Sequence, residues 1–252
     1  MTTLSTLPFG ETLKAWRARR HLSQLDLALD ANVSARHISF LETGKARPSR
    51  EMVLQLAETM SLPLRARNEL LEQAGFVRAF AETGLDAETL GPIRTALSHM
   101  LASHMPFPAL ICDRHWTLID ANPAAKALLA PLLGRESNVA RMLATSPLAR
   151  QLIANWTELM RDFAGRLRLE VARSGGDPIL RELLELVKVD DEPHTASARP
   201  FIPVILRNGE SSLSLMSMLA EFGTPRDITI SDLRIELFFP ADAATEAYFR
   251  GR

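Results

Sequence analysis

The sequence predicts an all-α N-terminal domain of five helices, followed by an α+β domain with a five-stranded antiparallel sheet. Two observations predict this division. Apolar residues recur every three or four positions through roughly the first 75 of the 252 residues, which is the period of an amphipathic helix. Strand-like runs with alternating apolar residues occur at 109–120 and 201–240. The chain has room for two domains. We therefore expect the helical domain over 1–76, a linker over 77–92 and the mixed domain over 93–252.

The first two helices are predicted from an apolar face and a capping pattern. Phe9, Leu13 and Trp16 are spaced four and three residues apart and share one helical face. Ser23 is a favoured N-cap residue, and Asp26 three positions later can complete a capping box. The second helix is therefore expected in the run LSQLDLALDA.

A third helix follows the tight turn ANV. Ser34 is a second N-cap residue, and the helix that it begins is expected to run to about Glu42. Gly44 can adopt the left-handed conformation that ends a helix, and Pro48 prevents the helix from continuing.

Two more helices complete the N-terminal domain. Ser49 caps the fourth helix, whose buried face is formed by Met52, Val53, Leu56 and Met60. The fifth lies in SLPLRARNELLEQAGF, with Pro63 in its first turn and Gly75 at its end.

The C-terminal domain is predicted as a hairpin, a block of helices and a group of three strands. The hairpin pairs Ala109–Cys112 with Trp116–Asp120 across the turn DRH. One long helix is expected over 148–173, because apolar residues recur there every three or four positions. Five strands with helices over one face can form a single mixed domain. The remaining elements are helices at 93–104, 123–133, 137–145 and 177–189, a loop at 190–200, and strands at 201–207, 211–222 and 232–240.

Composition and charge narrow the classes of function. The net charge is −1, yet residues 14–50 hold eight Lys and Arg against three Asp and Glu. A basic segment on a near-neutral chain is typical of a DNA-binding domain. The single cysteine, Cys112, excludes an intramolecular disulfide, and we expect it to serve packing. The sequence has no signal-peptide pattern and no membrane-spanning run, so a cytoplasmic protein without membrane contact is expected.

Motifs that carry catalysis are absent from the sequence. It has no G-x-S-x-G motif, no phosphate-binding loop and no Cys/His metal spacing. Lys188 and the serines of 211–217 are candidates for a Ser–Lys pair, but nothing in the sequence places them together. His99 and His104 are five residues apart on different helical faces, which makes a poor pair of metal ligands. We therefore expect no enzyme activity, no metal and no cofactor.

A helix, a three-residue turn and a capped second helix form the helix-turn-helix arrangement of DNA-binding proteins. The second helix, 34–42, would lie in the major groove. The alternative is a helical bundle with a solvated charged face. Gln24, in the first turn of the preceding helix, can donate to a phosphate. The base-reading candidates are Ser34, Ala35, Arg36, His37, Ser39 and Phe40, of which Arg36 suits guanine, and the phosphate-binding candidates are Lys14, Arg17, Lys45, Arg47 and Arg50.

Residues 9–62 resemble the helix-turn-helix of the phage-repressor-like XRE family. The residues that carry the resemblance are LSQ, the run V-S-x-x-x-I-S-x-L-E-x-G and the following RPS. Leu25 departs from the family, which usually has an acidic residue there, and this change affects a surface interaction rather than the fold. The resemblance implies a sequence-specific regulator of double-stranded operator DNA. One recognition helix makes few base contacts, so we expect a homodimer on a two-fold operator.

Three later segments resemble the MmyB-like transcription regulators. They are LPLRARNELLEQAGF, PFPALICDRHWTLIDANPAAKALL and FGTPRDITISDLRIELFFPADAATE. In that family a PAS-like ligand-binding domain follows the helix-turn-helix, and the resemblance implies a fatty acid or another lipid-like effector. Asn122 opens the Asn-Pro-Ala step seen in PAS folds, and its first role is that of an N-cap residue.

The C-terminal domain contains many methionines, leucines and aromatic residues that suit an adaptable apolar pocket. Taken one at a time they are ordinary core residues, but together they allow a pocket between sheet and helices, with a cation near a ligand's carboxylate. A haem or flavin sensor, and a protein-interaction or dimerisation module without ligand, stay open as alternatives. The ligand-binding candidates are Met105, Phe107, Arg114, Trp116, Leu128, Leu129, Met142, Leu143, Trp156, Met160, Phe163, Met216 and Met218.

Overall fold

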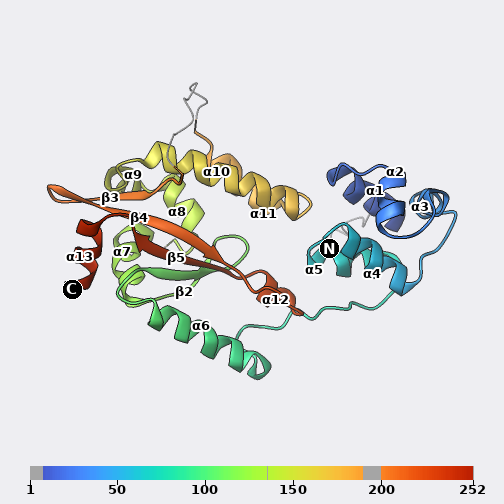
Figure 1. The fold of residues 1–252 in the computed structure, drawn as a ribbon, viewed down its shortest axis with the longest axis horizontal. Helices are drawn as coiled ribbons and strands as arrows, with labels where there is room; N and C mark the ends of the chain where they lie inside the picture. The colour runs from blue at the N-terminus through green and yellow to red at the C-terminus, as the bar shows by residue number, and fades with distance from the viewer. Residues whose placement is uncertain (1–7, 135, 190–199, 252) are drawn as a thin grey trace. The chain divides into compact units, whose positions relative to one another are not determined.

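The computed structural model describes residues 8–134, 136–189 and 200–251 (Figure 1). Two compact units are formed, the first mainly by residues up to Glu82 and the second mainly by the remainder of the chain. The loop predicted at 190–200 lies, apart from Pro200, outside the described residues.

The first unit contains the five predicted helices. Their caps are local: Ser23 accepts a hydrogen bond from the backbone N–H of Asp26 in a complete capping box, and Ser34 and Ser49 accept equivalent bonds three residues ahead. Pro63 is the N-cap residue of the fifth helix rather than part of its first turn, which corrects the prediction by one position. The helices are α1 (Phe9–Arg19), α2 (Gln24–Asp30), α3 (Ala35–Glu42), α4 (Arg50–Thr59) and α5 (Leu64–Gln73).

A shared apolar core holds these five helices together. Leu13, Leu27, Ile38, Leu56 and Leu70, one from each helix in turn, are fully buried in it. Burying a leucine or isoleucine contributes about 1.5–3 kcal/mol, so the core stabilises the unit far more than the caps do. The predicted all-α domain is confirmed.

The segment after α5 is hydrogen-bonded to that helix. Asn68 is 4% exposed. Its side-chain oxygen accepts from the backbone N–H of Ala79 and Phe80, and its Nδ2 donates to the Phe80 carbonyl. A buried amide with three satisfied bonds fixes this part of the chain to the helical unit.

The second unit is built on a five-stranded antiparallel sheet, as predicted. Its strand order is β2-β1-β5-β4-β3, so the last strand in sequence lies at the centre. The confirmed α+β, PAS-like arrangement brings the early hairpin beside the later strands. The strands are β1 (Ala109–Cys112), β2 (Leu118–Ala121), β3 (Val204–Asn208), β4 (Ser211–Ala220) and β5 (Arg234–Pro240).

The hairpin between β1 and β2 departs from its predicted bounds. Trp116 has φ of 66°, in the left-handed region, so it belongs to the turn, and β2 begins at Leu118. The carboxylate of Asp113 holds this turn by accepting from the backbone N–H of His115 and Thr117. A local side-chain to backbone bond of this kind competes successfully with strand pairing.

Helices cover both faces of the sheet, which corrects the expectation that they lie on one. Leu97 and Leu101 of α6 (Gly91–Ser103) pack against Ala109 and Ile111 of β1. The alternate β1 residue Leu110 faces the opposite cluster. The helices of this second face are α7 (Pro123–Leu133), α8 (Val139–Thr145), α9 (Pro147–Leu152) and α10 (Trp156–Arg173), and α11 (Pro178–Val187) packs on α8.

The long helix predicted over 148–173 is two helices, α9 and α10. The chain leaves the helical path at Ile153, which pairs with Leu206 of β3. Asn155 then accepts from the Ile205 N–H and donates to the Pro203 carbonyl. Because these partners lie about fifty residues away in the chain, the local periodicity does not reveal the break.

Three short elements and one proline complete the second unit. Sequence analysis did not predict α13 (Ala243–Arg250), although Asp242 caps it by accepting from the Thr245 N–H. The others are a 3-10 turn, η1 (Glu88–Leu90), and α12 (Ile228–Ser231). Pro131 lies inside α7 and cannot donate a hydrogen bond to the carbonyl four residues earlier.

Candidate DNA-binding surface and ligand cavity

The exposed side of α3 carries a stacked pair of cations. The Arg36 guanidinium lies 5.1 Å from the centroid of the Phe40 ring, and Lys45 Nζ lies 6.0 Å from the same centroid. Both distances fit cation–π contacts. Phe40 therefore holds two positive charges in place beside the helix that is expected to enter the major groove.

The other predicted DNA contacts lie at or near the surface of the same unit. The Ser34 hydroxyl caps α3 by accepting a hydrogen bond from the His37 N–H. Ala35, His37 and Ser39 are partly exposed. Among the described residues, none forms an ion pair with the exposed cations Lys14, Arg36, Lys45, Arg47 and Arg50. These five charges are thus available to an anionic partner.

Sequence analysis placed Arg17 and Gln24 on phosphates, but both partly buried side chains form hydrogen bonds within the domain. Arg17 donates from Nε and Nη2 to the two carboxylate oxygens of Glu42 at 2.6 and 3.0 Å, and from Nη1 to the Leu22 carbonyl. Gln24 Nε2 donates to Glu42 Oε2 at 2.8 Å. The Glu42 side chain is 2% exposed, so this network positions α1, α2 and α3.

The pKa of Glu42 is lowered in this network. Burial alone would raise it, but hydrogen bonds from Arg17 and Gln24, together with the charges of Arg17 and Lys14, have the larger combined effect.

Gly10 packs directly on the end of α3: a Cβ there would lie 2.5 Å from the Glu42 carbonyl oxygen. Glycine is therefore required where α1 meets α3.

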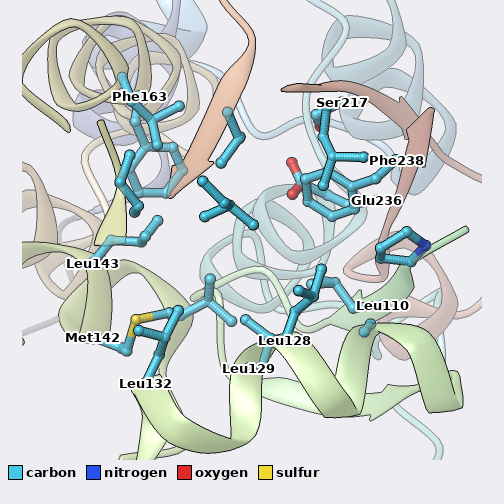
Figure 2. A pocket seen from close by; sticks show the side chains of 18 of the residues that line it. Leu110, Leu128, Leu129, Leu132, Met142, Leu143, Phe163, Ser217, Glu236 and Phe238 are labelled. Atoms are coloured by element: carbon cyan, nitrogen blue, oxygen red, sulfur yellow. The ribbon is translucent and has the colours of Figure 1, made fainter. Parts of the chain in front are cut away.

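A cavity of about 120 Å³ lies in the second unit between the sheet and helices α7, α8 and α10 (Figure 2). Its wall is almost entirely apolar. Such a cavity, walled by aliphatic and aromatic side chains with few polar groups, is the usual form of a small-molecule site. The lining residues include Leu110, Leu128, Leu129, Leu132, Val139, Met142, Leu143, Ile153, Phe163, Leu206, Leu215 and Phe238.

Some of the predicted ligand-binding residues line this cavity and others do not. Trp116, Leu128, Leu129, Met142, Leu143 and Phe163 are in its wall. Met160 is fully buried but does not line the cavity, and Trp156 donates from Nε1 to the Leu143 carbonyl. The remaining predicted residues, Met105, Phe107, Arg114, Met216 and Met218, lie elsewhere in the unit.

Each of these outlying residues has a local reason for its position. The ring of Phe107 packs edge-on against Phe249, and Arg114 forms an ion pair with Asp232. Met216 and Met218 alternate with the cavity-lining Ser217 along β4, so they face the other side of the sheet. Met105 follows α6 and is exposed.

Polar groups that sequence reasoning missed lie in the cavity wall. Arg166 of α10 forms an ion pair with Glu236 of β5, and Ser217 of β4 and Asp162 of α10 also line the cavity. Strand alternation contained a signal for two of them: Ser217 shares a face with Leu215, and Glu236 shares one with Phe238. A charged residue such as Glu236 on the buried face of a strand indicated a polar group in the wall.

Two further buried groups adjoin this wall. Trp116 Nε1 donates to Glu170 Oε2 at 3.0 Å, and burial, opposed by this hydrogen bond, raises the pKa of Glu170. Burial also raises the pKa of the Cys112 thiol, to which the charges of Glu236 and Asp113 add, so this thiol is unreactive. Among the described residues, no three His, Cys, Asp or Glu side chains are grouped to hold a metal.

A helix-turn-helix with free cations and a mixed domain with an apolar cavity define a class: DNA-binding transcription regulators with a ligand-binding domain. Comparison with family models agrees with this class. A model described as helix-turn-helix matches residues 13–66, and the model of the MmyB-like transcription regulator ligand binding domain matches residues 93–251. The chain belongs to the MmyB-like transcription regulators, and the predicted XRE-type and MmyB-like resemblances are confirmed.

Comparison with curated proteins finds no match. In the part of the chain that the structure describes, no helix is long and apolar enough to cross a membrane.

Proposed function

We propose that this regulator acts as a homodimer whose second unit binds a hydrophobic small molecule, a fatty acid or another lipid-like effector, and thereby changes its affinity for a two-fold operator. The apolar cavity carries this proposal. Its wall suits a hydrocarbon chain, and burial of each CH₂ group contributes about 0.8 kcal/mol. An effector of this kind therefore gains affinity with chain length.

The cavity is small, so binding of a larger effector should change the conformation of the protein. An engineered cavity of about 150 Å³ admits benzene, and this one is about 120 Å³. A longer chain exceeds this volume, and we expect wall elements to move when it binds. Such a movement distinguishes a bound from a free state, and the effector's differential affinity for the two states sets how far DNA binding changes.

Mass spectrometry of an organic extract of the denatured protein tests the effector proposal. The expected result is a long-chain lipid in near-stoichiometric amount. Ala125 lines the cavity and is buried, whereas Ala130 on the same helix is exposed. Ala125→Leu should therefore lower the lipid content about tenfold, and Ala130→Leu should leave it unchanged.

An extract without lipid, together with no binding of added long-chain lipids to the folded protein, would refute the effector proposal. The second unit would then be better explained as a protein-interaction or dimerisation module. The dimer is tested separately by light scattering and by footprinting, which should show two half-sites about one helical turn apart.

A further inference from the structure

The polar groups of the cavity wall restrict the head group of an effector. We infer, on the basis of the proposed lipid-binding function, that the head is uncharged and both donates and accepts hydrogen bonds, as an alcohol, an amide or a protonated carboxylic acid does, and that Ser217, Glu236 and Arg166 recognise it. The wall thus selects against an ionised fatty acid.

Ser217 and Glu236 lie at one end of the cavity, which gives an effector a direction. Figure 2 shows Ser217 and Glu236 together on one side, with Met142 and Leu132 on the opposite side. Strand pairing agrees, because Ser217 is opposite Phe238 on β5, two residues from Glu236. The head therefore lies near β4 and β5, and the tail points toward α8 and the C-terminal end of α7.

The same groups have unused hydrogen-bonding capacity. Ser217 Oγ is buried, and no described residue bonds to it. Glu236 accepts a hydrogen bond through Oε1 from Arg166 Nη1. Its Oε2 has no hydrogen-bond partner among the described residues, and the Arg166 guanidinium keeps further N–H donors. A ligand hydroxyl can donate to Glu236 Oε2 while it accepts from Ser217 or Arg166. A buried hydroxyl without a partner costs free energy, so a ligand that hydrogen-bonds to Ser217 Oγ removes this cost.

The charge of the wall opposes an anionic head. Among the described residues, the wall carries one cation, Arg166, and two acids, Glu236 and Asp162. Asp162 is exposed and forms no ion pair with the described residues, and Glu170 is one turn further along α10. A ligand carboxylate on the spare donors of Arg166 would lie beside the Glu236 carboxylate, whose side chain is 10% exposed. The two like charges would repel each other, which disfavours the ionised head.

Calorimetric titration of the full-length protein with matched probes tests this inference. Dodecan-1-ol and dodecanoate have the same tail, and near pH 8 the acid is ionised because carboxyl pKa values lie near 4. We expect the alcohol to bind at least about tenfold more tightly than the acid, which corresponds to roughly 1.4 kcal/mol.

Variants connect any preference to the named residues. Glu236→Gln removes the charge at nearly constant shape and should strengthen dodecanoate binding about tenfold relative to the alcohol. Glu210→Gln, an exposed change in the turn between β3 and β4, is the matched control and should alter neither. Ser217→Ala leaves the ion pair intact, so it remains informative if Glu236→Gln does not fold. It should weaken the alcohol several-fold.

The two proposals fail in different ways. Dodecanoate binding as tightly as the alcohol, or unaltered ratios in both variants, would overturn the head-group inference and leave the lipid proposal standing. If neither probe binds and the extract is empty, the lipid proposal fails and the head-group inference fails with it.

Discussion

The two units differ in how completely their buried charged groups are hydrogen-bonded. In the first, Glu42 is fully engaged by Arg17 and Gln24, and this network fixes three helices around an exposed basic surface. In the second, Arg166 and Glu236 make one hydrogen bond and keep spare hydrogen-bonding capacity beside a cavity that is also lined by Ser217, whose hydroxyl has no partner among the described residues. A fully hydrogen-bonded network suits a surface that must keep its shape, whereas unused hydrogen-bonding capacity suits a site that binds a ligand.

The largest expected effect comes from opening the closed network. Glu42→Ala leaves the Arg17 guanidinium buried without its partner, so the first unit should lose about 3–5 kcal/mol of stability. Hydrogen exchange of the α1–α3 amides measures this loss unit by unit. Glu58→Ala, an exposed change on α4, should cost under about 0.5 kcal/mol. A similar small cost for Glu42→Ala would show that the network is dispensable.

A comparable test in the second unit removes its most connected amide. Asn122 is 2% exposed, caps α7 at Ala125, accepts from Ala109 N–H and donates to Leu101 and Phe107 carbonyls. Asn122→Ala should therefore cost about 2–4 kcal/mol, detected as faster exchange of β1 and α7 amides. The α1–α3 amides should be unaffected, and joint destabilisation would contradict a division into two units.

On the first unit's surface, effects should appear in DNA binding and leave stability almost unchanged. Arg36→Ala should weaken specific operator binding by about 1–3 kcal/mol and relax the preference at one base pair. Binding to a set of operators with single substitutions measures both. Equal weakening on every sequence would reassign Arg36 to a phosphate.

Lys45→Ala should give a smaller and uniform effect. Loss of one phosphate contact reduces the slope of log affinity against log salt by about one unit, without a change in sequence preference. Lys126→Ala removes an exposed lysine of α7 and is the control, with an unaltered slope. An altered base preference in Lys45→Ala would give this residue a role in reading bases.

Acid should affect the units in opposite directions. Because the folded-state pKa of Glu42 is lowered, its stabilisation is complete above the unfolded pKa and is lost as the pH falls through the folded pKa. The pKa of Glu170 is raised by burial, so the second unit loses stability as the pH rises from the unfolded to the folded pKa. Hydrogen exchange against pH measures both, and Glu170→Gln, which keeps an acceptor for Trp116, should remove the second trend.

Sequence reasoning succeeded wherever the causes of structure are local. Ser23, Ser34 and Ser49 cap helices through partners three residues away, so the first unit was predictable helix by helix. It failed where the partner is distant. Arg17 is a typical phosphate-binding residue by type, and only the fold brings Glu42 to it across 25 positions.

The same limit applies to the cavity. Trp116 and Phe163 were both named among the ligand-binding candidates, and their rings lie 4.8 Å apart in an edge-on contact. The polar wall could not be assembled in this way, because Arg166 and Glu236 are 70 positions apart. Apolar character can be read from composition, but the pairing of charges requires the topology of the sheet.

The proline inside α7 has a consequence for how a ligand enters. Leu128, Leu129 and Leu132 of this helix line the cavity, and Pro131 removes one of the hydrogen bonds that would hold its last turn. Local opening of this turn therefore costs less free energy than opening of the hydrogen-bonded sheet opposite. We therefore expect a long molecule to enter at this end of α7, through a local opening that leaves the sheet paired.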